Sequence, residues 1–180
     1  MHTIEISGWT LWIQDKELPD LYPDYLKHAR FIDQIDIHNP AGQFFFLAIS
    51  NVEAASDWPS TVIVQKYQNE WGATPGILIV PETNILFIGA GDRLLCYDIG
   101  KQKRLWEDSC DLCFWELHRS GPYVLMSAEL EFGVWTIEGE KLWSTFVEPP
   151  WSYKVSGDIV ALDVMGNTRL LNLSDGSSAK

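Results

Sequence analysis

Three cysteines and a nearby histidine are the residues of this sequence best suited to metal or redox chemistry. Cys110 and Cys113 form a Cys-x-x-Cys pair, His118 follows it, and Cys96 lies one predicted strand earlier. Thiolates and an imidazole could hold zinc in a tetrahedral site. Such sites normally add a second Cys or His pair, and a redox dithiol uses a helix N-terminus, whereas this pair enters a predicted strand. We therefore expect ordinary reduced thiols, with no metal and no cofactor.

The carboxylates form no recognisable catalytic motif. Glu129 and Glu131 lie at a predicted turn, and Glu107, Asp108, Asp111 and Glu116 surround the cysteine pair. A glycosidase needs two carboxyl groups roughly 5 to 10 Å apart across a sugar, and sequence spacing cannot show this. Solvated turn residues are the simpler interpretation.

Other catalytic signatures are also missing from the sequence. The four histidines (His2, His28, His38 and His118) have no spacing that suggests a triad or a metal set. Gly89-Ala90-Gly91 leads into a predicted strand, whereas phosphate-binding glycine motifs precede a helix. We therefore expect a protein that is not an enzyme.

The net charge limits the choice of partner. The chain carries 13 Lys and Arg against 25 Asp and Glu, a formal net charge of −12. Nucleic acids and anionic membranes need a basic surface, so we expect neither as a partner. A basic protein partner fits, because complementary charge accelerates association. The competing interpretation is that the charge serves solubility alone.

Targeting signals are absent from the beginning of the sequence. Met1–Glu5 lacks the basic and apolar regions of a secretory signal, and the longest apolar run, Phe44–Ile49, is too short to span a bilayer. Three cysteines form no disulfide framework. We expect a cytoplasmic protein with a single domain over residues 1–180.

The second half of the sequence repeats itself at a period of roughly 36 to 38 residues. The repeated stretches are 88–107, 127–144 and 163–172. Trp115 and Trp151 occupy equivalent places, as do Ser120-Gly121 and Ser156-Gly157. A period in this range indicates an array of small β units.

Short apolar runs between Gly, Pro, Asn and Asp residues predict the strands. In the repeats they are 76–80, 85–89, 94–98, 103–107, 113–118, 123–128, 132–137, 142–146, 151–155, 159–163 and 169–173. The less regular portion, 1–75, adds strands at 31–37, 43–50 and 61–67 and at most two helical turns at 19–26. The predicted fold is all-β, with three or four propeller-like antiparallel sheets in one compact domain. A β-sandwich is the alternative.

Two of the units resemble the repeats of quinoprotein-like and WD-type β-propellers. In that pattern an apolar strand ends in Asp or Thr, and a Gly-containing turn leads to Lys/Arg-Leu-Trp. Leu95-Cys96-Tyr97-Asp98 with Arg104-Leu105-Trp106 follows it, as does Gly133-Val134-Trp135-Thr136 with Lys141-Leu142-Trp143. The resemblance extends over about 76–173 and implies a fold, with no quinone or calcium site. Segments 125–131, 143–151 and 162–166 also resemble bacterial proteins of unestablished function.

The last unit lacks a predicted fourth strand. Circular arrays often complete their last sheet with a strand from the other terminus. The stretch Thr3–Ile13 is rich in Ile and Trp. We therefore expect it to fill this place.

Tryptophan is the most distinctive residue type, with nine copies. Trp106, Trp115, Trp135 and Trp143 recur at repeat positions, which predicts that they pack in the core. Trp58 and Trp151 lie beside prolines and are better candidates for exposure. Exposed tryptophans bind sugars and mark protein interfaces.

Loops beside the repeats are the predicted binding surface, since loops on a rigid scaffold often carry function. The candidate residues are Trp58, Glu129, Glu131, Glu148 and Trp151. The predicted function is a non-catalytic protein-interaction module with a basic partner, for example a small inhibitor or immunity-type protein. The alternative is a small-ligand or carbohydrate-binding protein with a Trp-lined cleft.

Overall fold

A computed structural model describes residues 1–53, 56–68, 72 and 74–179, and within these ranges the chain forms four sheets and one short helix. In spatial order, the first sheet contains β1 (His2–Ile6), β2 (Trp9–Lys16), β4 (Gln43–Asn51), β5 (Thr61–Tyr67) and β3 (Phe31–Ile35). The second contains β6 (Gly76–Val80), β7 (Ile85–Ala90), β8 (Arg93–Asp98) and β9 (Lys103–Ser109). The third contains β10 (Phe114–Ser120), β11 (Tyr123–Ala128), β12 (Glu131–Thr136) and β13 (Lys141–Phe146). The fourth contains β14 (Trp151–Ser156), β15 (Ile159–Val164) and β16 (Asn167–Asn172).

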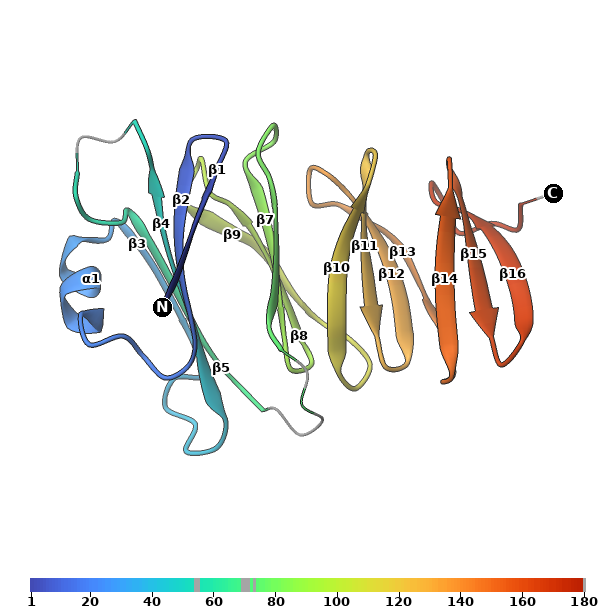
Figure 1. The fold of residues 1–180 in the computed structure, drawn as a ribbon, viewed down its shortest axis with the longest axis horizontal. Helices are drawn as coiled ribbons and strands as arrows, with labels where there is room; N and C mark the ends of the chain where they lie inside the picture. The colour runs from blue at the N-terminus through green and yellow to red at the C-terminus, as the bar shows by residue number, and fades with distance from the viewer. Residues whose placement is uncertain (54–55, 69–71, 73, 180) are drawn as a thin grey trace.

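The sheets stack face to face in chain order along the long axis of the molecule (Figure 1). Each of the last three is an antiparallel meander, as in a propeller blade. Four layers confirm the predicted all-β, propeller-like fold and exclude the two-layered β-sandwich. The first and last sheets lie at opposite ends of the row, so the array is open (Figure 1).

The N-terminal strands do not complete the fourth sheet, so that prediction is wrong. Strands β1 and β2 form a hairpin through Ser7 and Gly8, both at positive φ, and β2 pairs along its whole length with β4. Closing a short hairpin costs less chain entropy than joining the two ends of the chain. Instead, the C-terminal tail folds back on β16, where Ser178 bridges to Leu171.

Burial follows position in the stack. Strands β7 and β11 lie in middle sheets and are buried on both faces, so nearly all of their residues are inaccessible. Strand β15 alternates instead, with Val160 and Leu162 buried and their neighbours partly open. This alternation is typical of a sheet with one solvated face. Ser152, Lys154 and Thr168 lie on that outer face.

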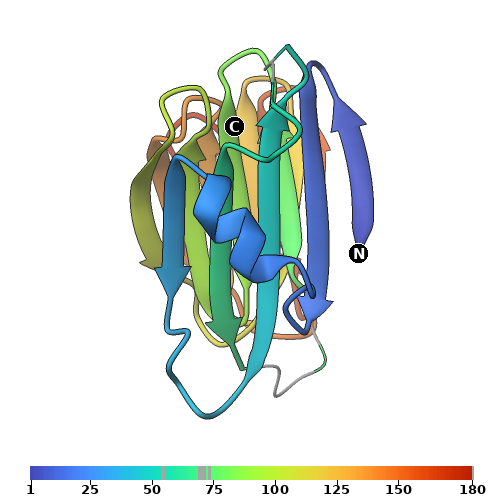
Figure 2. The ribbon, with the colours of Figure 1, turned by 90° about the vertical axis from the view of Figure 1, so that its left-hand side faces the viewer.

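The other end of the stack is covered by a helix. Helix α1 (Tyr22–His28) lies across the outer face of the first sheet (Figure 2). Its Tyr25 packs against Phe46 and, with Val62 and Val64, forms a separate apolar cluster. No helix in the described part of the chain is long and apolar enough to cross a bilayer.

Candidate functional site

One end of the stack gathers most of the predicted site residues (Figure 1, lower end). It is formed by the connections β7–β8, β9–β10, β11–β12 and β13–β14, and we call it the loop face. Glu129 and Glu148 lie in these connections, while Glu131 and Trp151 begin the strands that follow them. Trp58 lies in the β4–β5 connection at the opposite end, so the five candidates do not form one site.

Backbone hydrogen bonds fix the β9–β10 loop between the second and third sheets. The amide of Cys110 donates to the Asp92 carbonyl, and that of Phe114 donates to the Gly91 carbonyl, each across 2.8 Å. The Cys113 carbonyl accepts from Glu129 across 2.9 Å. The loop is therefore held at both ends, and it joins two neighbouring sheets.

Trp115 is an exposed aromatic residue of the loop face. It is the extra residue of a β-bulge between Phe114 and Glu116, where β10 shifts register against β11. A bulge re-aims the side chain it carries, and 39% of Trp115 is accessible. The prediction that Trp115 packs in the core is therefore wrong, although Trp135 is buried and Trp106 and Trp143 are partly buried.

Trp115 stacks on Trp151 of the next sheet, with ring centroids 5.4 Å apart and planes 15° apart. The Trp151 indole donates to the Glu129 carbonyl across 3.1 Å, and its edge packs against Phe132. Trp151 is thus half-buried and held in place rather than freely exposed as predicted. The result is a rigid aromatic platform, Trp115–Trp151, at the junction of the third and fourth sheets.

Glu116 and Tyr153 lie beside this platform. The Tyr153 hydroxyl donates to Glu116 Oε1 across 3.3 Å. Burial, followed by the nearby Glu116 carboxylate, raises the pKa of Tyr153 to about 12. The tyrosine therefore stays neutral at physiological pH, and its hydroxyl holds the Glu116 side chain next to the platform.

Four carboxylates of the loop face have no partner among the residues that the structure describes. Asp92, Asp111, Glu129 and Glu148 make no side-chain ion pair or hydrogen bond within the described ranges. Glu131 differs, because it is only 9% exposed and accepts from the Asp111 amide across 3.2 Å. Its role is to position the loop, which corrects its prediction as an exposed turn residue.

Two basic side chains near this end, those of Arg93 and Lys141, are already engaged. Arg93 pairs with Asp36, which directly follows β3, and with Glu107. Lys141 pairs with Asp108 across 2.8 Å. Among the described residues, the loop face therefore presents four unpaired carboxylates, while the cations Arg93 and Lys141 are paired.

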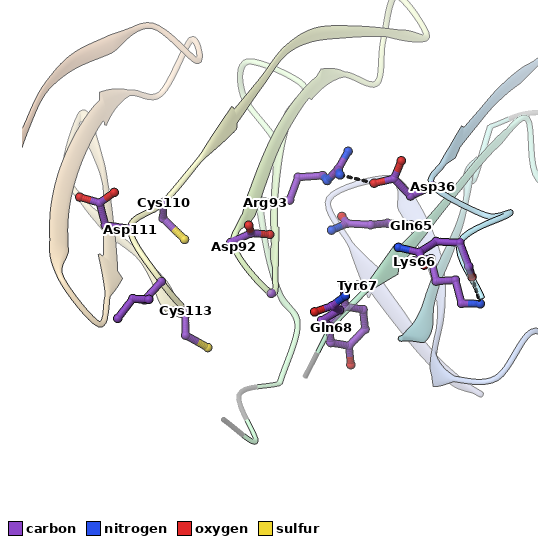
Figure 3. Close-up of a pocket in the computed structure, with 13 residues that line it drawn as sticks. Asp36, Gln65, Lys66, Tyr67, Gln68, Asp92, Arg93, Cys110, Asp111 and Cys113 are labelled. Carbon is purple, nitrogen blue, oxygen red and sulfur yellow. Dashed lines mark hydrogen bonds and ion pairs between the residues drawn. The ribbon is translucent and has the colours of Figure 1, made fainter. Parts of the chain in front are cut away.

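A cleft of about 470 Å³ opens between the first and second sheets at this end (Figure 3). Its walls include Gln65 and Lys66 of β5, the turn residues Asp92 and Arg93, and the β9–β10 loop. The lining is mainly polar. The cleft and the aromatic platform lie on either side of the β9–β10 loop, because Trp115 is the second residue of β10, directly after this loop.

Cys110 and Cys113 line this cleft, whereas Cys96 lies in β8 beside Gly139. All three are buried and reduced. Burial, aided by nearby carboxylates, raises the pKa of Cys96 and of Cys110 to about 12 and also raises that of Cys113. The described residues hold no His, Cys, Asp and Glu cluster that could bind a metal ion.

Trp58 belongs to a second cavity, of about 370 Å³, at the opposite end. Its ring stacks on His28 with centroids 4.3 Å apart and planes 7° apart. Trp9 also lines this cavity but is only 8% exposed. Both indoles are therefore largely covered, and little aromatic face is left for a ligand.

Sequence reasoning missed Trp115, Asp92 and Gln65. The bulge that exposes Trp115 has no sequence signal, because its alternation reads as an ordinary strand. Asp92 resembled any turn residue. Gln65 did carry a signal, since it is a polar residue on the same parity as the buried Ile63 of β5.

Comparisons with known proteins place the chain only loosely. No protein-family model matches the sequence, and no curated protein matches it. Among solved structures, it is similar to the computationally designed Ika4 protein, with 20% identity, a TM-score of 0.46, and coverage of 63% of this chain and 76% of that one. BamB from Moraxella catarrhalis shows 12% identity, a TM-score of 0.44, and coverage of 75% and 41%. A europium-containing methanol dehydrogenase shows 12% identity, a TM-score of 0.42, and coverage of 58% and 23%.

Proposed function

We propose that this protein is a non-catalytic interaction module that binds a basic protein partner through its loop face. One observation carries the proposal: an exposed tryptophan on a rigid stack shares the loop face with four carboxylates that have no partner among the described residues. Aromatic residues at the centre of an interface supply much of its binding energy. The carboxylates select a positively charged surface and accelerate its approach.

The aromatic platform favours Arg and Lys from the partner. A guanidinium or ammonium group placed over an indole is attracted by the ring, and the attraction grows when water is excluded. Glu116 and Glu129 lie beside the rings and add charge to this attraction. Because Trp115 is already held by Trp151, little side-chain entropy is lost on binding.

Binding of a fluorescent peptide of alternating Arg and Gly residues tests the proposal. We expect fluorescence anisotropy to show binding that weakens as salt rises, because salt screens exposed charges. Removing the four free carboxylates (Asp92→Asn, Asp111→Asn, Glu129→Gln and Glu148→Gln) should weaken binding by about tenfold or more. Trp115→Ala should weaken it by a similar factor, about tenfold.

A matched control removes four charges elsewhere: Glu5→Gln, Glu138→Gln, Glu140→Gln and Asp158→Asn. These residues are exposed, and they lie away from the loop face. This variant should bind the peptide nearly as well as the wild type. Equal losses in both variants would show attraction to total charge alone and would refute a specific binding face.

The carbohydrate alternative has weaker support. The Trp-lined cavity at Trp58 and Trp9 has its indoles covered by His28 and by burial. Tryptophan fluorescence that shifts with soluble sugars, but not with the basic peptide, would favour this alternative and contradict the interaction module.

A further inference from the structure

Gln65 is a polar residue at the centre of an apolar strand. It is 0% exposed, and Nε2 of its amide donates to the Ala90 carbonyl across 3.0 Å. The amide oxygen, Oε1, is buried and has no hydrogen-bond partner within the described ranges. Buried acceptors nearly always have a donor, and leaving one unpaired destabilises the protein. A hydrogen-bond donor from outside the described residues would satisfy Gln65 Oε1.

The amide forms part of the wall of the cleft between the first and second sheets. Its end points from β5 toward the corner where Asp92 and Arg93 lie (Figure 3). Asp92 is exposed and lines the same cleft. The cleft therefore offers an entering group the Asp92 carboxylate on one wall and, just beneath another wall, an amide oxygen that is covered in the unbound protein.

The two cationic side chains that line the cleft already have partners. The Arg93 guanidinium is shared between Asp36 and Glu107. The Lys66 ammonium donates to the Asn39 carbonyl and lies 5.0 Å from the centre of the Phe44 ring. The acceptors Gln65 Oε1, Asp92 and Asp111 have no such partners among the described residues. Among the described residues, the two cationic groups of the cleft are thus paired, whereas these three acceptors are not.

The electrostatic potential around the cleft is negative, which also favours a guest that donates hydrogen bonds. Burial is the main cause of the raised pKa of Cys110 and Cys113, but Asp92 raises the pKa of both thiols further. Glu131 also raises the pKa of Cys110, and Glu129 also raises that of Cys113. A negative potential therefore extends into the loop that forms one wall of the cleft, and it favours a positively charged guest.

We propose that the cleft receives the guanidinium group of an arginine side chain from the basic partner, with Gln65 Oε1 and the Asp92 carboxylate as its acceptors. This inference rests on the proposed function and adds a second anchor to the aromatic platform. A guanidinium offers five N–H donors in a planar fork and is weakly hydrated, which suits a recessed site with several acceptors. A volume of about 470 Å³ lies within the range of small-ligand sites.

Titration with N-acetyl-arginine amide, followed by NMR of ¹⁵N-labelled protein, tests the proposal directly. We expect the side-chain amide signals of Gln65 and the backbone signal of Asp92 to shift with one common affinity. The citrulline analogue has nearly the same shape but no charge, and it should bind at least about tenfold more weakly. Equal binding of citrulline, or of N-acetyl-lysine amide, would overturn the assignment of a guanidinium site.

Two variants separate the proposed contact from a structural role. Gln65→Met keeps the length of the side chain and removes the acceptor, and Asp92→Asn removes an exposed charge. Each should weaken binding of the arginine amide by about tenfold or more, while Asp158→Asn in the fourth sheet should not. Asp92→Asn lies on the surface and keeps the test valid if Gln65→Met fails to fold. Unchanged binding in a folded variant would refute the proposal.

Failure of the arginine-cleft proposal can be distinguished from failure of the proposed interaction module. If the Arg-Gly peptide binds the loop face but Gln65→Met and Asp92→Asn leave the arginine amide titration unchanged, only the cleft assignment is wrong. If the peptide binds the four-carboxylate variant as well as the wild type, the interaction module itself is refuted.

Discussion

The indole N–H of Trp143 donates to the carbonyl oxygen of Leu173 across 2.8 Å and so joins the third sheet to the fourth. Trp106, at the equivalent place in the preceding repeat, donates in the same way to the Gly139 carbonyl and joins the second sheet to the third. Each Trp also packs on an aromatic ring, Trp143 on Phe132 and Trp106 on Trp135. The repeated Lys/Arg-Leu-Trp sequence therefore has a physical role: its tryptophan attaches one sheet to the next.

Trp143→Ala should destabilise the protein by about 3 kcal/mol, because it removes a large half-buried ring and leaves the Leu173 carbonyl unpaired. Trp143→Phe keeps most of the packing and should cost about 1 to 2 kcal/mol. Urea unfolding followed by circular dichroism measures both. A near-neutral Trp143→Ala would show that the ring does not hold the sheets together.

Trp115→Ala provides the contrast between a binding residue and a structural one. Trp115 is 39% exposed and its main partner is Trp151. An aromatic pair contributes about 0.5 to 1.5 kcal/mol beyond its buried area, so we expect a loss near 1 to 2 kcal/mol, smaller than that for Trp143→Ala. The same urea experiment tests this order. The reverse order would mean that Trp115 serves mainly to hold the third and fourth sheets together.

Gly89→Ala should be destabilising even though its backbone is ordinary strand. A Cβ at Gly89 would lie 2.4 Å from ring atoms of Phe114, which is fully buried. Overpacking of this kind typically costs about 1 to 3 kcal/mol. Because Phe114 precedes Trp115, the tryptophan emission of the folded variant should also change. Gly157→Ala is a useful comparison, since a Cβ there meets nothing within 4 Å and the positive φ of 59° is the only source of strain.

The sequence predicted the bounds of the repeated strands and of β4 and β5 closely, but it did not predict how the first sheet is assembled. Tyr123–Ala128 and Gly76–Val80 have the predicted bounds, because turn residues delimit short apolar runs. Strand β3 was also expected, but its parallel pairing with β5 depends on α1 and on contacts distant in the sequence. The candidate site was harder to predict from the sequence than the strands were. Trp115 is exposed by a one-residue bulge, and the cleft depends on how two sheets meet at Gln65.

The buried thiols predict a loss of stability at alkaline pH. The pKa of Cys96 and that of Cys110 are raised to about 12 in the folded protein, whereas an unfolded thiol titrates near 8.5. Above about pH 9 the unfolded chain binds fewer protons than the native protein, so the free energy of unfolding should fall as pH rises toward 12. Cys96→Ala and Cys110→Ala should each make this fall shallower in urea titrations between pH 8 and 11. At pH 8 the native thiols should also react with a disulfide reagent far more slowly than the thiols of the urea-unfolded chain, because only the thiolate is nucleophilic. Rapid reaction of native Cys110 at pH 8 would show that its thiol is accessible and ionised.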